Sequence, residues 1–302
     1  MTAQDQLKTA RSLKKTLIVS LTNERKRKMN PYKINGPSLI SFSGGRTSGF
    51  MLWNILQAHN GKLPNDVYVT FANTGKEAPE TLDFVHDVSE KWDVPIHWLE
   101  LEIADERPIW RTRIVTYETA SRNGEPFDAM LKKRPYLPNP VTRFCTSELK
   151  INVMKRFMKN INGYKEWEYV IGLRYDEPRR VASARKPNNE PWNNVLPMAD
   201  AKHTVEDVTE FWSKQNFDLN LTNAYGKTPA GNCDLCFLKG MDTTISILKE
   251  RPEMANWWIE KEQQVGATFR KDRPSYIQLL DISKNQQTLF NDDDQMTCFC
   301  HD

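Results

Sequence analysis

A short apolar segment leads into a glycine-rich turn and then into a helical pattern near the start of the chain. Residues 38–42 read Ser-Leu-Ile-Ser-Phe and residues 43–49 read Ser-Gly-Gly-Arg-Thr-Ser-Gly, after which apolar side chains recur at helical spacing from Met51 to Leu56. This order predicts a buried strand, a tight loop and a helix. No other stretch of the chain constrains the fold as strongly.

The alternation of strand and helix continues along the chain. Residues 67–71 and 95–99 predict two further strands with a helix entered at Pro79 between them, and a helical pattern from Leu149 precedes a fourth strand at 167–172. Strands that alternate with helices form βαβ units with right-handed crossovers. The sequence therefore predicts an α/β fold with a doubly wound, mostly parallel sheet.

Two regions depart from this alternation. The stretch 103–140 is rich in Pro, Arg and Asn, and we expect an irregular loop or lid there. Beyond it, residues 204–207 resemble a capping box, and further helices are expected at 241–249 and 252–264.

Charge and composition divide the chain further. Its first 36 residues hold nine Lys and Arg against two acidic residues, a net +7 that leaves −4 for the remainder of a 302-residue chain with a total of +3. We expect three parts: a basic arm (1–36), an α/β domain (37–200) and a helical, cysteine-containing region (201–302) packed on that domain. The arm suits a polyanion such as nucleic acid, or serves as a solvated tail.

The apolar runs are short throughout the chain. None approaches the ~20 residues of a membrane span, and none has the pattern of a secretory signal. A cytoplasmic location without a membrane partner is therefore expected.

The glycine-rich turn has the composition of an anion cradle. Backbone N–H groups of a glycine loop at a helix N-terminus bind phosphate, and hydroxyls and a cation add to this. The loop lacks the Walker lysine and the dinucleotide fingerprint. The candidate phosphate-binding residues are Ser43, Gly44, Gly45, Arg46, Thr47 and Ser48.

Four blocks in order carry a resemblance to a known family. Residues 43–48 resemble the PP-loop of the adenine nucleotide alpha hydrolase superfamily. Residues 71–81 (Phe-Ala-Asn-Thr-Gly-Lys-Glu-Ala-Pro-Glu-Thr), 142–150 (Thr-Arg-Phe-Cys-Thr-Ser-Glu-Leu-Lys) and 172–180 (Gly-Leu-Arg-Tyr-Asp-Glu-Pro-Arg-Arg) are similar to segments of its phosphoadenosine phosphosulfate (PAPS) reductase branch. The resemblance spans about residues 38–200.

The resemblance implies a bound adenine nucleotide, namely PAPS, adenylyl sulfate (APS) or ATP, with Mg²⁺ as a further candidate. It places the site at the carboxyl ends of the strands, in agreement with the switch-point rule. Besides the loop, the expected nucleotide-binding residues are Asn73, Thr74, Gly75, Lys150, Gly172, Arg179 and Arg180. The expected catalytic residues are Arg143, Arg174, Cys145 and Cys300. The guanidinium groups of the two arginines would bind sulfate or phosphate oxygens.

Two positions depart from the family pattern. Thr47 stands where ATP-cleaving members carry an aspartate, which removes a candidate Mg²⁺ ligand. The chain reads Cys-Phe-Cys-His-Asp at 298–302, where PAPS reductases carry Glu-Cys-Gly-x-His. ATP cleavage and standard PAPS reduction are both less strongly indicated for this reason.

The five cysteines favour metal or redox chemistry over a disulfide framework, because the number is odd and the chain lacks a secretion signal. In one arrangement, Cys145, Cys233 and Cys236 hold an iron–sulfur cluster, as in sulfur-transferring relatives. In another, Cys233, Cys236, Cys298 and Cys300 form a closed site, in which His301 or Cys145 can replace one thiolate. An iron–sulfur cluster is favoured over zinc, and a redox dithiol or a mobile C-terminal thiol arm remains an alternative.

Three functions are consistent with these features. The leading hypothesis is a PAPS reductase-like enzyme that performs sulfur-related redox or transfer chemistry, with a thiol or sulfur donor protein as a candidate partner. The second is ATP-dependent adenylation and thiolation of nucleic acid, which the basic arm favours. The third is a non-catalytic, nucleotide-binding regulatory protein, in keeping with the two departures.

Overall fold

The computed structural model describes residues 30–134, 136–224, 226 and 228–285. Most of the basic arm and the C-terminal Cys298, Cys300 and His301 lie outside the described residues, so the predictions made for them stay predictions.

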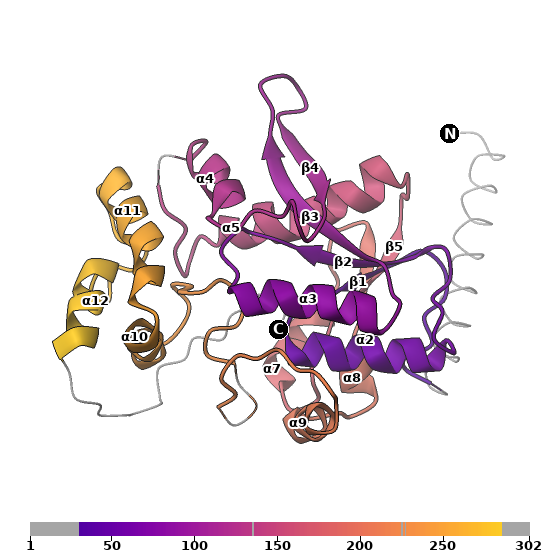
Figure 1. The fold of residues 1–302 in the computed structure, drawn as a ribbon. Helices are drawn as coiled ribbons and strands as arrows, with labels where there is room; N and C mark the ends of the chain where they lie inside the picture. The colour runs from indigo at the N-terminus through magenta and orange to yellow at the C-terminus, as the bar shows by residue number, and fades with distance from the viewer. Residues whose placement is uncertain (1–29, 135, 225, 227, 286–302) are drawn as a thin grey trace.

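Six strands form one sheet in the order β4-β3-β2-β1-β5-β6 (Figure 1). Neighbouring strands are parallel, except that β3 and β4 are antiparallel. The predicted α/β fold with a mostly parallel sheet is confirmed. The strands are β1 Ser38–Ser41, β2 Val67–Ala72, β3 Ile96–Ile103, β4 Trp110–Val115, β5 Trp167–Val170 and β6 Trp192–Val195.

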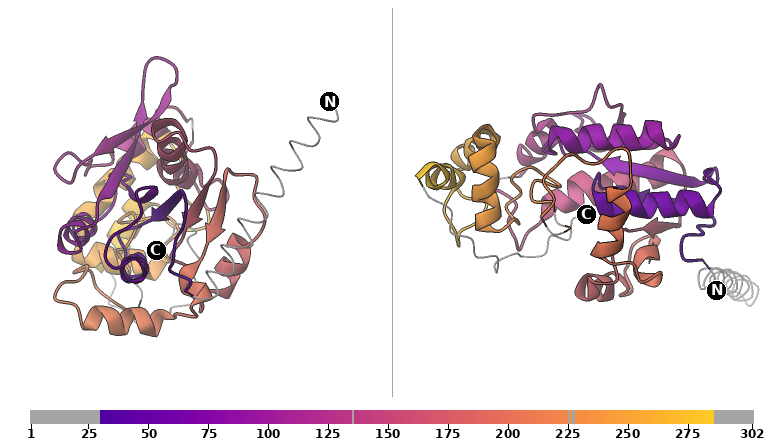
Figure 2. Two further views of the ribbon diagram at one scale, coloured as in Figure 1. Left: turned by 90° about the vertical axis from the view of Figure 1, so that its right-hand side faces the viewer. Right: turned by 60° about the horizontal axis from the view of Figure 1, so that its bottom comes forward.

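Helices cover both faces of the sheet (Figure 2). The longer ones are α2 Arg46–Ala58, α3 Pro79–Lys91, α9 Val205–Ser213, α10 Met241–Glu250, α11 Ala255–Val265 and α12 Tyr276–Asn285. The short ones are α4 Glu125–Leu131, α7 Pro178–Ala184, α8 Pro197–Asp200 and the 3-10 turn η3 Pro252–Met254. One further helical segment consists of α5 Phe144–Thr146, η1 Ser147–Ile151, α6 Asn152–Arg156 and η2 Phe157–Ile161, in which η1 and η2 are π-helical turns.

The sheet separates two apolar cores. Successive residues of a strand point to opposite faces, and accordingly Leu39 joins one core while its neighbour Ile40 joins the other. The Ile40 core contains the apolar faces of α2, α3 and α9. The Leu39 core contains those of α4, α6 and the C-terminal helices, with Trp258 and Leu279 fully buried in it.

The helices α10, α11 and α12 lie together at one end of the molecule (Figure 1). Trp257 Nε1 donates to Asp128 of α4 at 2.9 Å, and Arg251 forms an ion pair with Glu80 in the first turn of α3. This confirms the predicted helical C-terminal region, in which Cys233 and Cys236 are both buried. These contacts fix it to the α/β part of the fold.

Part of the prediction for residues 103–140 is wrong. This stretch contains β4 and α4. β4 is an edge strand with an exposed Arg113, and the turn between β3 and β4 contains a cis Arg107-Pro108 bond, which accounts for the Pro and Arg residues. The predicted strands at 67–71 and 95–99 are confirmed as β2 and β3, although β3 extends to Ile103. The sequence reading also missed the short strand β6.

Across the described part of the chain, none of the helices combines the length and the apolar character that a membrane crossing demands.

Candidate functional site

The predicted site residues follow three adjacent strands. The glycine loop (residues 43–48) follows β1, residues 73–77 follow β2, and residues 172–177 follow β5. β1 lies between β2 and β5, and all three are parallel. The loops therefore share the carboxyl edge at the point where the strand order reverses, which is where open α/β sheets bind ligands.

The glycine loop is held in shape by one hydroxyl. Ser48 Oγ accepts hydrogen bonds from the N–H groups of Ser43 (3.2 Å) and Gly45 (3.3 Å), lies 3.0 Å from Ser43 Oγ and donates to Gly45 O at 2.9 Å. The helix α2 begins directly after Gly45. Its positive end therefore adjoins a preformed loop, which is the arrangement that binds anions.

Position 44 of the glycine loop requires a glycine. Its φ is +77°, and a Cβ there would lie 2.7 Å from Thr81 Cγ2. Thr81 Oγ1 is itself buried without a hydrogen-bond partner within the described structure. Thr81 was not among the predicted site residues, although it is the last residue of the 71–81 motif, which is the sequence signal that points to it.

The side chain of Arg46 leaves the loop and ties it to a distant segment. Arg46 Nε donates to Asp218 Oδ1 at 2.7 Å, Nη1 donates to Thr228 Oγ1 at 3.1 Å, and Nη2 donates to Leu221 O at 2.9 Å. Trp212 Nε1 in turn donates to Arg46 O at 2.7 Å. These contacts engage Nε, Nη1 and Nη2 of the guanidinium with the segment 218–228, and the phosphate-binding role of Arg46 stays a prediction.

Arg174 joins the loop after β5 to the glycine loop. Its Nη1 donates to Thr47 Oγ1 at 3.1 Å, and its Nε donates to Asp176 Oδ1 at 3.0 Å. The backbone N–H of Arg174 donates to Glu177 Oε2 at 2.9 Å. One of the two predicted catalytic arginines thus lies against the predicted phosphate cradle.

Arg180 is buried with part of its guanidinium unused. Its side chain is 8% exposed and its Nη1 forms an ion pair with Glu177, but Nε and Nη2 have no partner within the described structure. Buried donors are normally satisfied. Arg179, its neighbour on α7, is exposed, and Gly172 is buried just after β5.

Thr74 and Glu77 form a closed pair after β2. The backbone N–H and the hydroxyl of Thr74 both donate to the Glu77 carboxylate at 2.9 Å. Burial raises the pKa of Glu77, while the charge of Lys150 and the bonds from Thr74 oppose that rise. The predicted residues Thr74 and Lys150 thus converge on a buried acid that sequence reasoning did not assign to the site.

Asn73 organises the start of the same loop. Its Nδ2 donates to Glu100 Oε1 at 2.7 Å and to Ser121 O at 2.8 Å, and its Oδ1 accepts from the N–H of Gly75 at 3.1 Å. All of its amide atoms are therefore used inside the protein. The contacts of Asn73 are those of a residue that shapes the loop.

Two predicted residues lie on the helical segment after residue 140. Arg143 immediately precedes α5, where its Nε donates to Pro140 O at 3.0 Å. Cys145 is half-buried in α5 against the Leu39 core. Lys150 lies on the π-helical turn η1, a rare geometry that is frequent at functional sites.

The cysteines of the described region do not form a metal centre. No three Cys, His, Asp or Glu side chains gather as metal ligands among the described residues, so Cys145, Cys233 and Cys236 are not assembled there. The alternative set that includes Cys298 and Cys300 lies partly outside the described residues. An iron–sulfur cluster or zinc ion stays a prediction.

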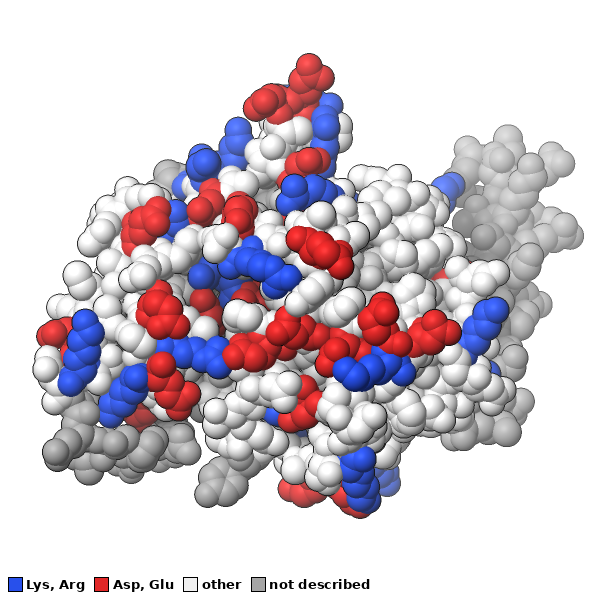
Figure 3. All heavy atoms as spheres, viewed as in Figure 1, with Lys and Arg blue, Asp and Glu red and all other residues white. Residues whose placement is uncertain are grey.

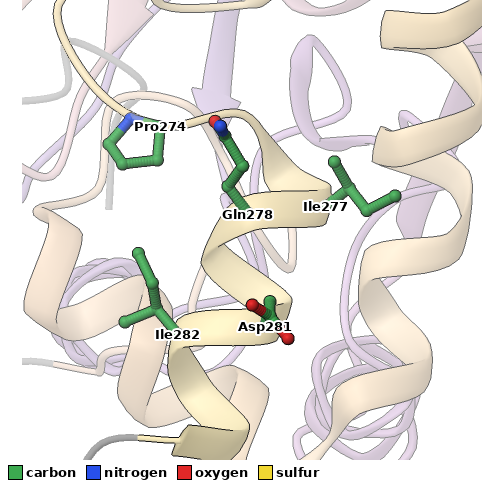
Figure 4. Close-up of a pocket in the computed structure, with 5 residues that line it drawn as sticks. All are labelled: Pro274, Ile277, Gln278, Asp281 and Ile282. Carbon is green, nitrogen blue, oxygen red and sulfur yellow. The ribbon is translucent and has the colours of Figure 1, made fainter.

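Two surface features of the described residues involve none of the predicted site residues. Figure 3 shows acidic side chains in a row over α3, the helix that carries Glu80, Asp83, Asp87 and Glu90. A shallow hollow on the C-terminal helices is lined by Pro274, Ile277, Gln278, Asp281 and Ile282 (Figure 4). None of the residues lining that hollow belongs to the predicted site, and the acidic row would repel a polyanion from α3.

Comparison with known proteins defines the class. Residues 37–222 match the phosphoadenosine phosphosulfate reductase domain, and the chain belongs to this family. It is 31% identical over 211 residues to an uncharacterized nin region protein, ORF290, of Escherichia phage lambda, an alignment that covers 67% of this chain and 66% of that protein. The chain thus spans just under two thirds of the length of this curated relative.

A solved structure gives a more distant comparison. The U34-tRNA thiolase NcsA from Methanococcus maripaludis, solved with its 4Fe–4S cluster, has a TM-score of 0.41 and 12% sequence identity. The match covers 93% of this chain and 86% of that chain.

Proposed function

We propose that the protein binds an adenine nucleotide, PAPS or APS with ATP as the alternative, and uses it for sulfur-related redox or transfer chemistry. Membership of the PAPS reductase domain family supports this proposal. The glycine loop and the arginine-bearing segment after β5 supply the oxyanion-binding groups. The nucleotide would lie at the carboxyl edge, between β1 and β5.

The unused donors of Arg180 carry the proposal. Nε and Nη2 lie on one edge of a guanidinium and donate in parallel, which matches two oxygens of one phosphate or sulfate group. Glu177 occupies Nη1, so among the described residues Nε and Nη2 of this 8% exposed side chain remain without a hydrogen-bond partner. A bound oxyanion would satisfy donors that otherwise cost free energy in the buried state.

The contact between Arg174 and Thr47 favours a sulfonucleotide over Mg²⁺-bound ATP. Family members that cleave ATP carry an acid where Thr47 stands, and an acid suits a Mg²⁺ ion. Here a hydroxyl accepts from a guanidinium at 3.1 Å instead. This contact supports direct binding of an anionic group by the fixed positive charge of Arg174.

The proposed roles follow from these positions. The N–H groups of the glycine loop would hold phosphate, and Arg143, Arg174, Arg179 and Arg180 would neutralise sulfate or phosphate. Cys145 and Cys300 are assigned to carry electrons or sulfur.

Equilibrium titration of the full chain with PAPS, APS and ATP tests the binding step. Arg180→Lys removes the paired donors but keeps the charge, and we expect about tenfold weaker binding of the preferred nucleotide. Arg185→Lys is the matched control, because Arg185 caps the same helix with a 55% exposed side chain. The absence of binding by all three nucleotides, or unchanged binding in Arg180→Lys, would contradict the proposal.

Product analysis separates the reaction classes. Release of sulfite from PAPS or APS in the presence of a thiol donor supports the reductase-like function. The basic arm, with its net charge of +7, supports a second candidate, the adenylation and thiolation of nucleic acid. Pyrophosphate released from ATP only when nucleic acid is added would favour that candidate, and binding without any turnover would favour a regulatory protein.

A further inference from the structure

A buried ion pair ties the loop after β2 to the C-terminal region. Lys76 Nζ lies 3.0 Å from Asp234 Oδ2, and the two side chains are 9% and 7% exposed. The backbones of the same two residues are also joined, because the N–H of Asp234 donates to Lys76 O at 2.7 Å. Lys76 directly follows the predicted nucleotide-binding residues Thr74 and Gly75. The pair therefore acts on the loop that carries them.

Each oxygen of the Asp234 carboxylate has a partner. While Oδ2 faces Lys76, Oδ1 accepts from Trp258 Nε1 at 2.8 Å and from the N–H of Leu235 at 2.7 Å. Trp258 belongs to α11 and is fully buried. A helix of the C-terminal region thus fixes the acid, and the acid fixes the ammonium group of the loop.

The charge of Lys76 is matched inside the protein. Besides its contact with Asp234, Lys76 Nζ lies 5.3 Å from the centroid of the Trp257 ring, whose face attracts a cation. Removing one partner of a buried ion pair leaves an uncompensated charge, which is strongly unfavourable. These contacts suit Lys76 to fixing the loop in place.

The next turn of the chain is held as well and reaches the glycine loop. Arg251, at the end of α10, donates through Nη1 to Glu80 Oε2 at 3.0 Å in the first turn of α3. The residue after Glu80 is Thr81, whose Cγ2 would lie 2.7 Å from a Cβ on Gly44. A displacement of the segment 74–80 would therefore be felt at the glycine loop.

We propose that Lys76 and Asp234 are positioning residues that hold the segment 74–80 in the conformation that binds the nucleotide. Without the pair, the loop would spend part of its time in conformations that do not bind. The dissociation constant would rise in inverse proportion to the fraction that remains competent. The effect on the nucleotide rests on the proposed function, whereas the effect on the loop does not.

A matched pair of double variants separates positioning from general stability. Lys76→Met/Asp234→Asn removes the ion pair without leaving one buried charge unpaired, and the asparagine keeps a carbonyl oxygen in place of Oδ1. Lys261→Met/Asp128→Asn is the control, because Lys261 Nζ lies 3.0 Å from Asp128 Oδ1 and 5.5 Å from the centroid of the same Trp257 ring. That second pair joins α11 to α4 instead of to the loop.

Hydrogen exchange of the ligand-free full chain measures the loop. Amides in peptides covering residues 73–80 should exchange about tenfold faster in Lys76→Met/Asp234→Asn than in the wild type, and at the wild-type rate in the control. Unchanged exchange, or equal acceleration in both double variants, would overturn the proposal. Asp234→Asn alone, which keeps the shape of both side chains, is measured in the same way if the double variant does not fold.

Equilibrium titration with PAPS, APS and ATP measures the consequence for the site. The dissociation constant of the preferred nucleotide should rise about tenfold in Lys76→Met/Asp234→Asn and stay within about twofold of the wild type in the control. Faster loop exchange with unchanged affinity would overturn the positioning role and leave the proposed function standing. Faster loop exchange in a chain whose wild type binds none of the three nucleotides would defeat the proposed function but not the hold on the loop.

Discussion

Arg174 Nη1 and Thr47 Oγ1 lie 3.1 Å apart, although 127 positions of sequence separate them. The bond joins the segment after β5 to the glycine loop after β1, across the point where the strand order reverses. Each of the two loops therefore helps to position the other, and a ligand that contacts one is sensitive to changes in both.

Thr47→Val removes this hydroxyl with little change of shape. We expect the unfolding free energy to fall by about 1 kcal/mol, the usual net contribution of such a hydrogen bond. Nucleotide affinity should fall as well, because Arg174 loses the contact that orients it. Isothermal titration and urea denaturation measure the two effects. Thr209→Val, on the exposed side of α9, is the control; equal nucleotide affinity in both variants would show that the bond does not matter for binding.

Gly44→Ala should disrupt the glycine loop more than its backbone conformation alone explains. Gly44 and Gly61 share a positive φ (+77° and +83°), but a Cβ at Gly44 lies 2.7 Å from Thr81 Cγ2, whereas none of the atoms around Gly61 lies within 4 Å. Gly61→Ala should cost about 1–2 kcal/mol for the left-handed conformation. Gly44→Ala should cost more in urea unfolding and should also weaken nucleotide binding. Equal losses of unfolding free energy in the two variants would show that the glycine loop accommodates the Cβ at position 44 without additional strain.

Arg46 and Asp218 should be energetically coupled. Arg46 is buried and Asp218 is 37% exposed, and Nε and Nη2 of the guanidinium both donate to the carboxylate. A double-mutant cycle with Arg46→Met and Asp218→Asn should give a coupling of about 1–3 kcal/mol in unfolding free energy. Additive effects would contradict a stabilising pair. The matched exposed pair Lys214–Glu210 should show a coupling below about 1 kcal/mol.

His59 should make stability depend on pH near neutrality. Its Nε2 accepts a hydrogen bond from the N–H of Ile34 at 3.0 Å, which requires the neutral imidazole. Burial, and secondly the charge of Lys33, lower the pKa of His59 below its ordinary 6.5. The unfolded chain therefore takes up this proton first as pH falls, so the stabilisation is complete above pH 6.5 and is lost below it.

Urea unfolding of the wild type and His59→Gln between pH 7.5 and 5.5 checks this sign. The advantage of the wild type should shrink as the pH is lowered, because only the wild type carries the titrating imidazole. A constant difference across the range would show that His59 does not titrate differently on folding.

Local pattern was sufficient for the framework of the fold. The apolar segments that became β1 and β2 were found because a buried parallel strand is a short apolar run ended by a turn. The extension of β3 was missed because Glu100 and Glu102 interrupt its apolar pattern. Glu100 is fully buried, and its carboxylate is satisfied by Asn73, Ser121 and Arg113, all of them distant in sequence. Hydrogen-bond partners that are distant in sequence cannot be recognised from the few residues around Glu100.

The candidate site was predictable in position but not in detail. The glycine loop and the arginines were identified from residue type and order, which fix which strand each segment follows. The direction of the Arg46 side chain depends on Asp218, 172 positions away, and the unused edge of Arg180 depends on how α7 packs. These features follow from tertiary packing, which spacing alone does not encode.

The strand β4 sets a limit on how the sheet can grow. It is the outermost strand on one side of the sheet, and Arg111 and Arg113 occupy its second and fourth positions. An incoming strand from another molecule would have to pair its main chain beside these guanidinium groups, which discourages edge-to-edge association. The same arginines that interrupt the apolar pattern of this strand should therefore disfavour polymerisation along that border when the protein is concentrated.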